Sequence, residues 1–163
     1  MLKLPDFHKS LSVLHYGCEA PRAYFIPFES ESATLNERRE TSAFFKRLCG
    51  EWDFKWYPSV THISGEDVPE MPDSHDTLDV PMSWQAALGR GYDVPQYTNV
   101  KYPYPVDPPN VPSENPCGLY RRYFTVTEQM LAGKEVYINF EGVDSCFYLY
   151  INGKFSAYSL VSH

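Results

Sequence analysis

Aromatic and charged residues alternate most regularly just after Gly50. Over residues 51–56, Trp52, Phe54 and Trp56 are separated by charged side chains. Successive side chains of a β-strand point to opposite faces of the sheet. The alternation therefore predicts a strand in which these three rings share one buried face.

Shorter apolar runs predict further strands, at residues 78–80, 119–126, 136–141, 145–151 and 154–158. The last two flank Asn152-Gly153, which favours a type I′ turn because both central residues of that turn have positive φ. One short helix is expected over residues 36–46, inside an otherwise irregular stretch. The pattern predicts an all-β fold: an antiparallel β-sandwich, of the jelly-roll kind, preceded by an N-terminal arm over residues 1–45.

A long proline-rich loop separates two of the predicted strands. Eight prolines lie within residues 81–117, together with aromatic residues at positions 84, 92, 97, 102 and 104. So much apolar surface is not left in water, which argues against disorder. A long ordered loop inside a small domain is typically functional.

Composition narrows the class of protein. Aromatic residues make up 16% of the 163 residues and there are 14 prolines, which suits short strands joined by stiff loops. The net charge is -7. Nucleic-acid binding needs a basic face to replace counterions, and no cluster of Lys and Arg supplies one, so we expect no nucleic-acid partner.

No run of about 20 apolar residues is present to span a bilayer, so we expect no membrane partner. The first ten residues lack the apolar core of a secretion signal.

The four cysteines are widely separated, without the paired spacing of a zinc site, so we expect free thiols, no metal site and a cytoplasmic location.

Four segments, taken in order, carry a resemblance to a known family. Residues 48–54 read L-C-G-E-W-D-F and residues 80–85 read V-P-M-S-W-Q. Residues 91–103 read G-Y-D-V-P-Q-Y-T-N-V-K-Y-P and lead into 108–120, and residues 140–159 hold the last segment. Together they resemble the N-terminal, galactose-binding-like domain of glycoside hydrolase family 2, and within it the bacterial β-galactosidases.

The resemblance implies that residues 46–163 are part of this sugar-binding β-sandwich, cut from a longer chain. It implies hydrolysis of terminal β-D-galactosyl residues by a retaining mechanism in the full-length enzyme, whose two glutamates lie on a downstream barrel. No catalytic residue is expected among these 163, and the isolated chain is expected to be inactive. The resemblance also implies contacts with the downstream domains, a homo-oligomer, and Mg and Na ions in the full-length enzyme. Val161 stands where some members have a sodium-binding Asp.

Two residues of the loop are candidates for binding the β-galactoside. The resemblance places the Asn of Y-T-N-V, here Asn99, in the galactose subsite, and its amide can both donate and accept hydrogen bonds with vicinal hydroxyls. The alternative is that Asn99 caps a turn beside Tyr102-Pro103. Asp93 is a second candidate for sugar contact, and its alternative is turn chemistry next to Val94-Pro95.

Other functions stay open at this point. β-Glucuronidases and β-mannosidases share the sandwich, so the chain could belong to another hydrolase of the family. A stand-alone carbohydrate-binding module, with sugar on an exposed aromatic platform, is a second alternative. A purely structural sandwich that mediates oligomerisation is a third.

Overall fold

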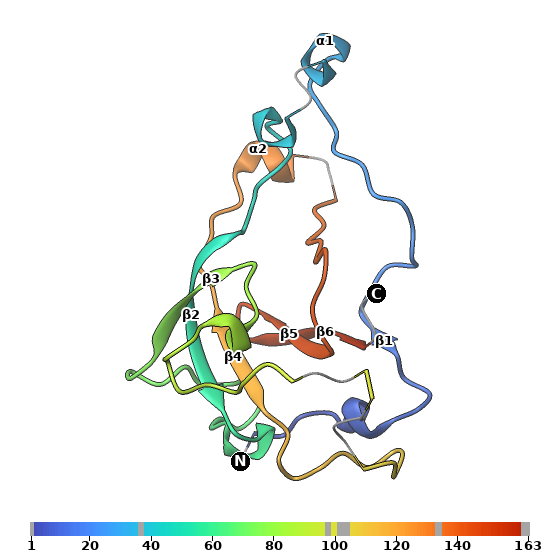
Figure 1. Cartoon of the computed structure of the whole chain (residues 1–163). Helices are drawn as coiled ribbons and strands as arrows, with labels where there is room; N and C mark the ends of the chain where they lie inside the picture. Colours follow the sequence, from blue (N-terminus) through green and yellow to red (C-terminus); the bar gives the residue numbers. More distant parts are fainter. Residues whose placement is uncertain (1, 36–37, 97–98, 101–104, 133–134, 161–163) are drawn as a thin grey trace.

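The computed structural model describes residues 2–35, 38–96, 99–100, 105–132 and 135–160. These residues form two antiparallel three-stranded sheets, ordered β1-β6-β5 and β3-β2-β4 (Figure 1). The strands are β1 (His15–Tyr16), β2 (Gly50–Tyr57), β3 (Asp76–Val80), β4 (Cys117–Arg121), β5 (Cys146–Ile151) and β6 (Lys154–Leu160). The helices α1 (Glu31–Thr34) and α2 (Glu128–Leu131) are single turns. Four 3-10 turns are also present: η1 (Asp6–Lys9), η2 (Arg39–Thr41), η3 (Val60–His62) and η4 (Trp84–Ala86).

The sheet β3-β2-β4 is organised around the central strand β2. Phe54 is fully buried, and its ring lies 4.8 Å from that of Tyr120 in β4, centroid to centroid. Trp52 pairs in register with Leu78, which is also buried. The expected strand is confirmed, although Trp52 and Trp56 are only partly buried.

The second sheet contains the predicted hairpin. Asn152 and Gly153 both have positive φ, 49° and 75°, as the expected turn requires. The β5–β6 register shifts between Leu149 and Tyr150, so that Leu149 pairs with Ala157 and Tyr150 with Phe155. A β-bulge inserts one extra residue into a strand, so the side chains that follow it change faces. Here the bulge lets aromatic rings from both strands meet on one face.

The beginning of the N-terminal arm completes this second sheet. β1 pairs with β6, and the Leu160 amide donates to the carbonyl of Leu14 over 2.8 Å. The ring of Phe7 lies 5.5 Å from that of the fully buried Tyr158. Beyond β1, the chain runs away from the sheets to α1 and back to β2 (Figure 1). The division into an arm (1–45) and a sandwich (46–163) stays a prediction.

Three expected elements are wrong or shifted. Residues 136–141 are not a strand: the segment is rich in apolar residues, but no strand of the described residues pairs with it. The strand expected at 119–126 runs from Cys117 to Arg121. The helix expected at 36–46 is replaced, over residues 38–46, by the short turn η2. There the Ser42 hydroxyl donates to the Pro27 carbonyl, so tertiary contacts override helix propensity.

The expected class of fold is confirmed as an all-β sandwich, with sheets that are not closed. All four cysteines are free thiols, as predicted. Burial raises the pKa of Cys117 in β4 to about 11, and the charge of Cys146 in β5 adds to the shift. No helix in the described part of the chain is long and apolar enough to cross a membrane.

Candidate functional site

The proline-rich loop leaves the sheet after Val80 and is anchored on the core at once. η4 places the indole of Trp84 6.3 Å from the ring of Phe54. Tyr92, further along the loop, meets the same Phe54 ring edge-on at 5.1 Å. One buried ring therefore holds the first part of the loop at two points.

Two hydrogen bonds return the loop to β3. The Tyr92 hydroxyl donates to Asp76 Oδ2 over 2.6 Å, and Arg90 Nη1 donates to the Thr77 carbonyl over 2.6 Å. Partial burial and, next, the bond to Asp76 raise the pKa of Tyr92. The phenol therefore stays protonated and remains a donor at neutral pH.

Asp93 follows directly and is held in a local turn. Its Oδ1 accepts from the amide of Val94 over 2.9 Å, and its Oδ2 accepts from Gln85 Nε2 over 3.4 Å. It lines an open hollow of about 340 Å³ formed by residues 85, 87–89 and 91–95. The structure thus brings Gln85 and Asp93 together, with the turn geometry that was the alternative for Asp93. A role in sugar contact stays a prediction.

Asn99 lies in an exposed bend further along the loop. In the sequence, it follows Asp93 by six positions. Tyr97, Tyr102 and Tyr104 lie outside the described residues, as does the residue at position 161. The role of Asn99 in the galactose subsite therefore stays a prediction.

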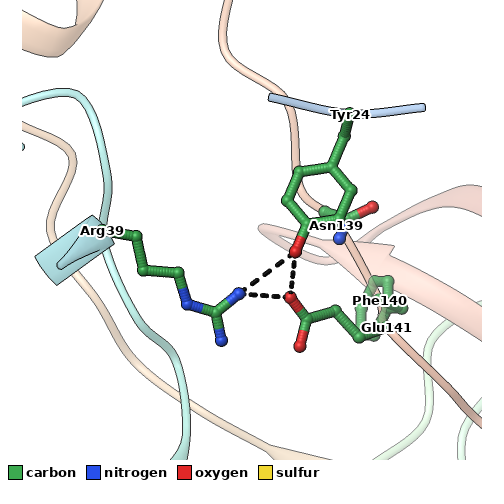
Figure 2. Close-up of a pocket in the computed structure, with 5 residues that line it drawn as sticks. All are labelled: Tyr24, Arg39, Asn139, Phe140 and Glu141. Atoms are coloured by element: carbon green, nitrogen blue, oxygen red, sulfur yellow. Dashed lines mark hydrogen bonds and ion pairs between the residues drawn. The ribbon is translucent and has the colours of Figure 1, made fainter. Parts of the chain in front are cut away.

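A second hollow, of about 490 Å³, lies between the arm and the segment before β5 (Figure 2). Arg39 Nη1 and the Tyr24 hydroxyl converge on Glu141 Oε1, at 2.5 Å and 2.6 Å, and Arg39 also donates to the Tyr24 hydroxyl. Asn139 and Phe140 complete the lining. The three polar groups satisfy one another, so this arrangement ties three distant segments together.

The chemistry available in this second hollow is limited. Hydrogen bonds from Arg39 and then Tyr24 lower the pKa of Glu141, so its carboxyl is ionised and has no proton to give as a general acid. A retaining glycosidase needs two carboxyl groups about 5–5.5 Å apart. Glu141 is the one carboxylate among the residues that line this hollow. The hollow therefore lacks the pair that this reaction requires.

No metal centre can be assigned to the described residues. Among them, no group of three or more His, Cys, Asp or Glu side chains is arranged to hold an ion. Neither hollow adds such a group, since one has Asp93 and the other Glu141 as its carboxylate.

Sequence reasoning identified the loop but missed the residues that hold it. The sequence patterns assigned no role to Asp76, Arg90 or Gln85. Each acts through a partner that is 8 to 16 positions away in the sequence. The spacing of a motif carries no signal for such bonds, whereas the pairing of β2 with β3 would have placed Asp76 beside Phe54.

The two antiparallel sheets and the anchored loop define the chain as an all-β sandwich domain. The sequence model described as "Glycosyl hydrolases family 2, sugar binding domain" matches residues 45–163. The chain belongs to this family.

Similar proteins include three bacterial β-galactosidases. The one from Actinobacillus pleuropneumoniae is 38% identical over 160 residues, which cover 98% of this chain and 15% of that protein. The one from Staphylococcus xylosus is 39% identical over 165 residues, covering 100% and 16%. The one from Lactococcus lactis subsp. lactis is 40% identical over 116 residues, covering 69% and 11%. The chain thus spans about one sixth or less of the relatives it matches.

Proposed function

We propose that the chain is the N-terminal accessory domain of a longer β-galactosidase, which hydrolyses terminal β-D-galactosyl residues. The observation that carries the proposal is the match to β-galactosidases over essentially the whole chain. In this proposal the domain lends a loop to the galactose subsite and buries surface against downstream domains. The same proposal includes a retaining mechanism, a homo-oligomer and a cytoplasmic location.

Asn99 is the residue that contributes to the sugar site in this proposal. Its exposed position lets a second domain close over it, as a subsite shared between domains requires. Because its amide donates and accepts, one side chain can bind two neighbouring hydroxyls of galactose. Asp93 is the second candidate in this proposal, and its two oxygens accept from the Val94 amide and from Gln85 Nε2 in the local turn.

The test is Asn99→Ala in the full-length protein. Loss of one or two hydrogen bonds to the sugar should lower kcat/KM for a chromogenic galactoside by a factor worth about 1–3 kcal/mol. Asn110→Ala is the matched control, because Asn110 lies exposed in the same loop and donates locally to Asp107 Oδ2 over 3.2 Å. Unchanged kcat/KM in a folded Asn99→Ala protein rejects the role.

The isolated 163-residue chain should show no turnover of the same galactoside, because the proposal places both catalytic glutamates outside it. Turnover at a rate like that of an intact enzyme would contradict this.

Titration of the chain with galactose or lactose separates the accessory domain from a stand-alone module. Binding at millimolar concentration or tighter favours the module, and no binding favours a site completed by another domain. A panel of β-glucuronides and β-mannosides, assayed on the full-length protein, tests the other hydrolases of the family.

A further inference from the structure

One side chain at the base of the loop, that of Tyr92, spans a strand pair of the sheet. Phe54 in β2 and Asp76 in β3 are partners in the antiparallel register. Tyr92 packs its ring against the first, at 5.1 Å and 77° between planes, and donates its hydroxyl to the second over 2.6 Å. The aromatic contact sets the depth of the Tyr92 ring, and the hydrogen bond sets its direction.

This tie fixes the path of the chain as well as one side chain. The loop departs at Val80, the last residue of β3, and Tyr92 returns it to Asp76, the first residue of the same strand. Arg90 adds a second bond at the neighbouring Thr77 carbonyl. The loop therefore runs back along β3 as far as Tyr92, which precedes Asn99 by seven positions in the sequence.

We propose that Tyr92 is a positioning residue for the sugar site, and that its hydroxyl, held by Asp76, fixes the base of the loop that carries Asn99. This inference rests on the proposed function. Tyr92 itself touches no sugar in this account and acts only through Asn99. A positioning role of this kind predicts energetic coupling between the two residues, because removing the first leaves the second present but misplaced.

A double-mutant cycle in the full-length protein tests the coupling. Tyr92→Phe keeps the ring on Phe54 and removes only the hydroxyl, and it should lower kcat/KM for a chromogenic galactoside by about 3- to 10-fold. In an Asn99→Ala background the same change should have almost no further effect. The inhibition constant of galactose should follow the same pattern, because it reports ground-state binding to the same subsite.

Two further variants separate positioning from general stability. Asp76→Asn keeps an acceptor for Tyr92 and should retain near-normal activity, whereas Asp76→Ala should behave like Tyr92→Phe without altering the tyrosine. Tyr137→Phe is the matched control, because the Tyr137 hydroxyl donates to Glu135 Oε2 over 2.5 Å at an exposed site away from the loop. It should leave kcat/KM unchanged.

The outcomes distinguish the two proposals. If Asn99→Ala lowers kcat/KM and the effect of Tyr92→Phe is absent or simply multiplies with it, the positioning role is overturned and the proposed function stands. If Asn99→Ala has no effect, the proposed sugar site falls, and the positioning role falls with it. Should Tyr92→Phe fail to fold, the pair Asp76→Ala and Asp76→Asn decides by the same criterion of coupling to Asn99.

Discussion

Gly118 in β4 faces Phe54 in β2 so closely that a β-carbon at position 118 would lie 2.8 Å from Phe54 Cε2. The same atom would lie 2.9 Å from both Trp84 and Tyr120. These neighbours are aromatic rings packed on one another, and such rings cannot give way locally. Gly118 is therefore a packing requirement of the core under the loop, although its φ is not in the left-handed region.

Gly118→Ala should consequently destabilise the domain by overpacking, by about 1–3 kcal/mol in the free energy of unfolding. Urea denaturation followed by tryptophan fluorescence measures this. Gly142→Ala is the control, since nothing lies within 4 Å of a β-carbon there. Equal stability of the two variants would show that the rings around Phe54 can rearrange.

Gly17 is required for a different reason, at the junction between β1 and the bulged strand β6. It has φ +65°, and a β-carbon would lie 2.2 Å from the Ser156 carbonyl oxygen. Gly17→Ala should detach β1 from β6, because the clashing atom is backbone. Hydrogen exchange of the Leu160 amide, which donates to Leu14, should then become faster.

The control for this prediction is Gly89→Ala, which has φ +81° and open space around the β-carbon. It carries the conformational cost of positive φ, about 1–2 kcal/mol, without the clash. If Gly17→Ala leaves exchange at Leu160 as slow as in the wild type, the close approach of Gly17 to Ser156 does not hold the arm in place.

The attachment of the arm should also depend on pH through His8. Its Nδ1 lies 2.7 Å from the Tyr148 hydroxyl, which donates to the Pro5 carbonyl. Burial is the main cause that lowers the pKa of His8, and the charge of Lys9 is the second. The charge of Asp6 opposes the shift. In the unfolded chain the pKa is about 6.5, so the unfolded state binds the proton first as pH falls. Stability contributed by neutral His8 is fully present above pH 6.5 and declines below it.

His8→Asn removes the titration and keeps an amide next to Tyr148. The loss of stability between pH 7 and pH 5.5, measured as the change in Tm, should therefore be smaller in this variant than in the wild type. Carboxylates titrate in both proteins and cancel in the comparison. Parallel pH profiles for the two proteins would show that His8 does not contribute.

The four thiols should fall into two classes of reactivity. Cys18 and Cys49 are exposed, whereas burial raises the pKa values of Cys117 and Cys146. Since the thiolate is the reactive form, a disulfide reagent at pH 8 should modify two thiols per folded chain rapidly. The other two should react only after unfolding in urea. Four equally fast thiols would contradict the burial of Cys117 and Cys146.

Several features were readable from sequence because they depend on local patterns. The period of two around Phe54 predicted β2, and Asn152-Gly153 predicted the β5–β6 hairpin, since strand alternation and positive φ are properties of neighbouring residues. The order of the family motifs over residues 45–163 predicted the family. Residues 136–141 show where this reasoning ends, because an apolar segment becomes a strand only if another strand pairs with it.

The sequence by itself determined the class of fold, the family and the loop that carries the candidate residues. Only the tertiary structure decided that β1 joins β6, that Glu141 is held by Arg39 and Tyr24, and that Tyr92 bridges Phe54 and Asp76. The physical reason is the range of the interactions involved. Alternation and turn preferences act over a few bonds of the backbone, whereas these contacts join residues 16 to 144 positions apart, whose proximity exists only once the sheets have formed.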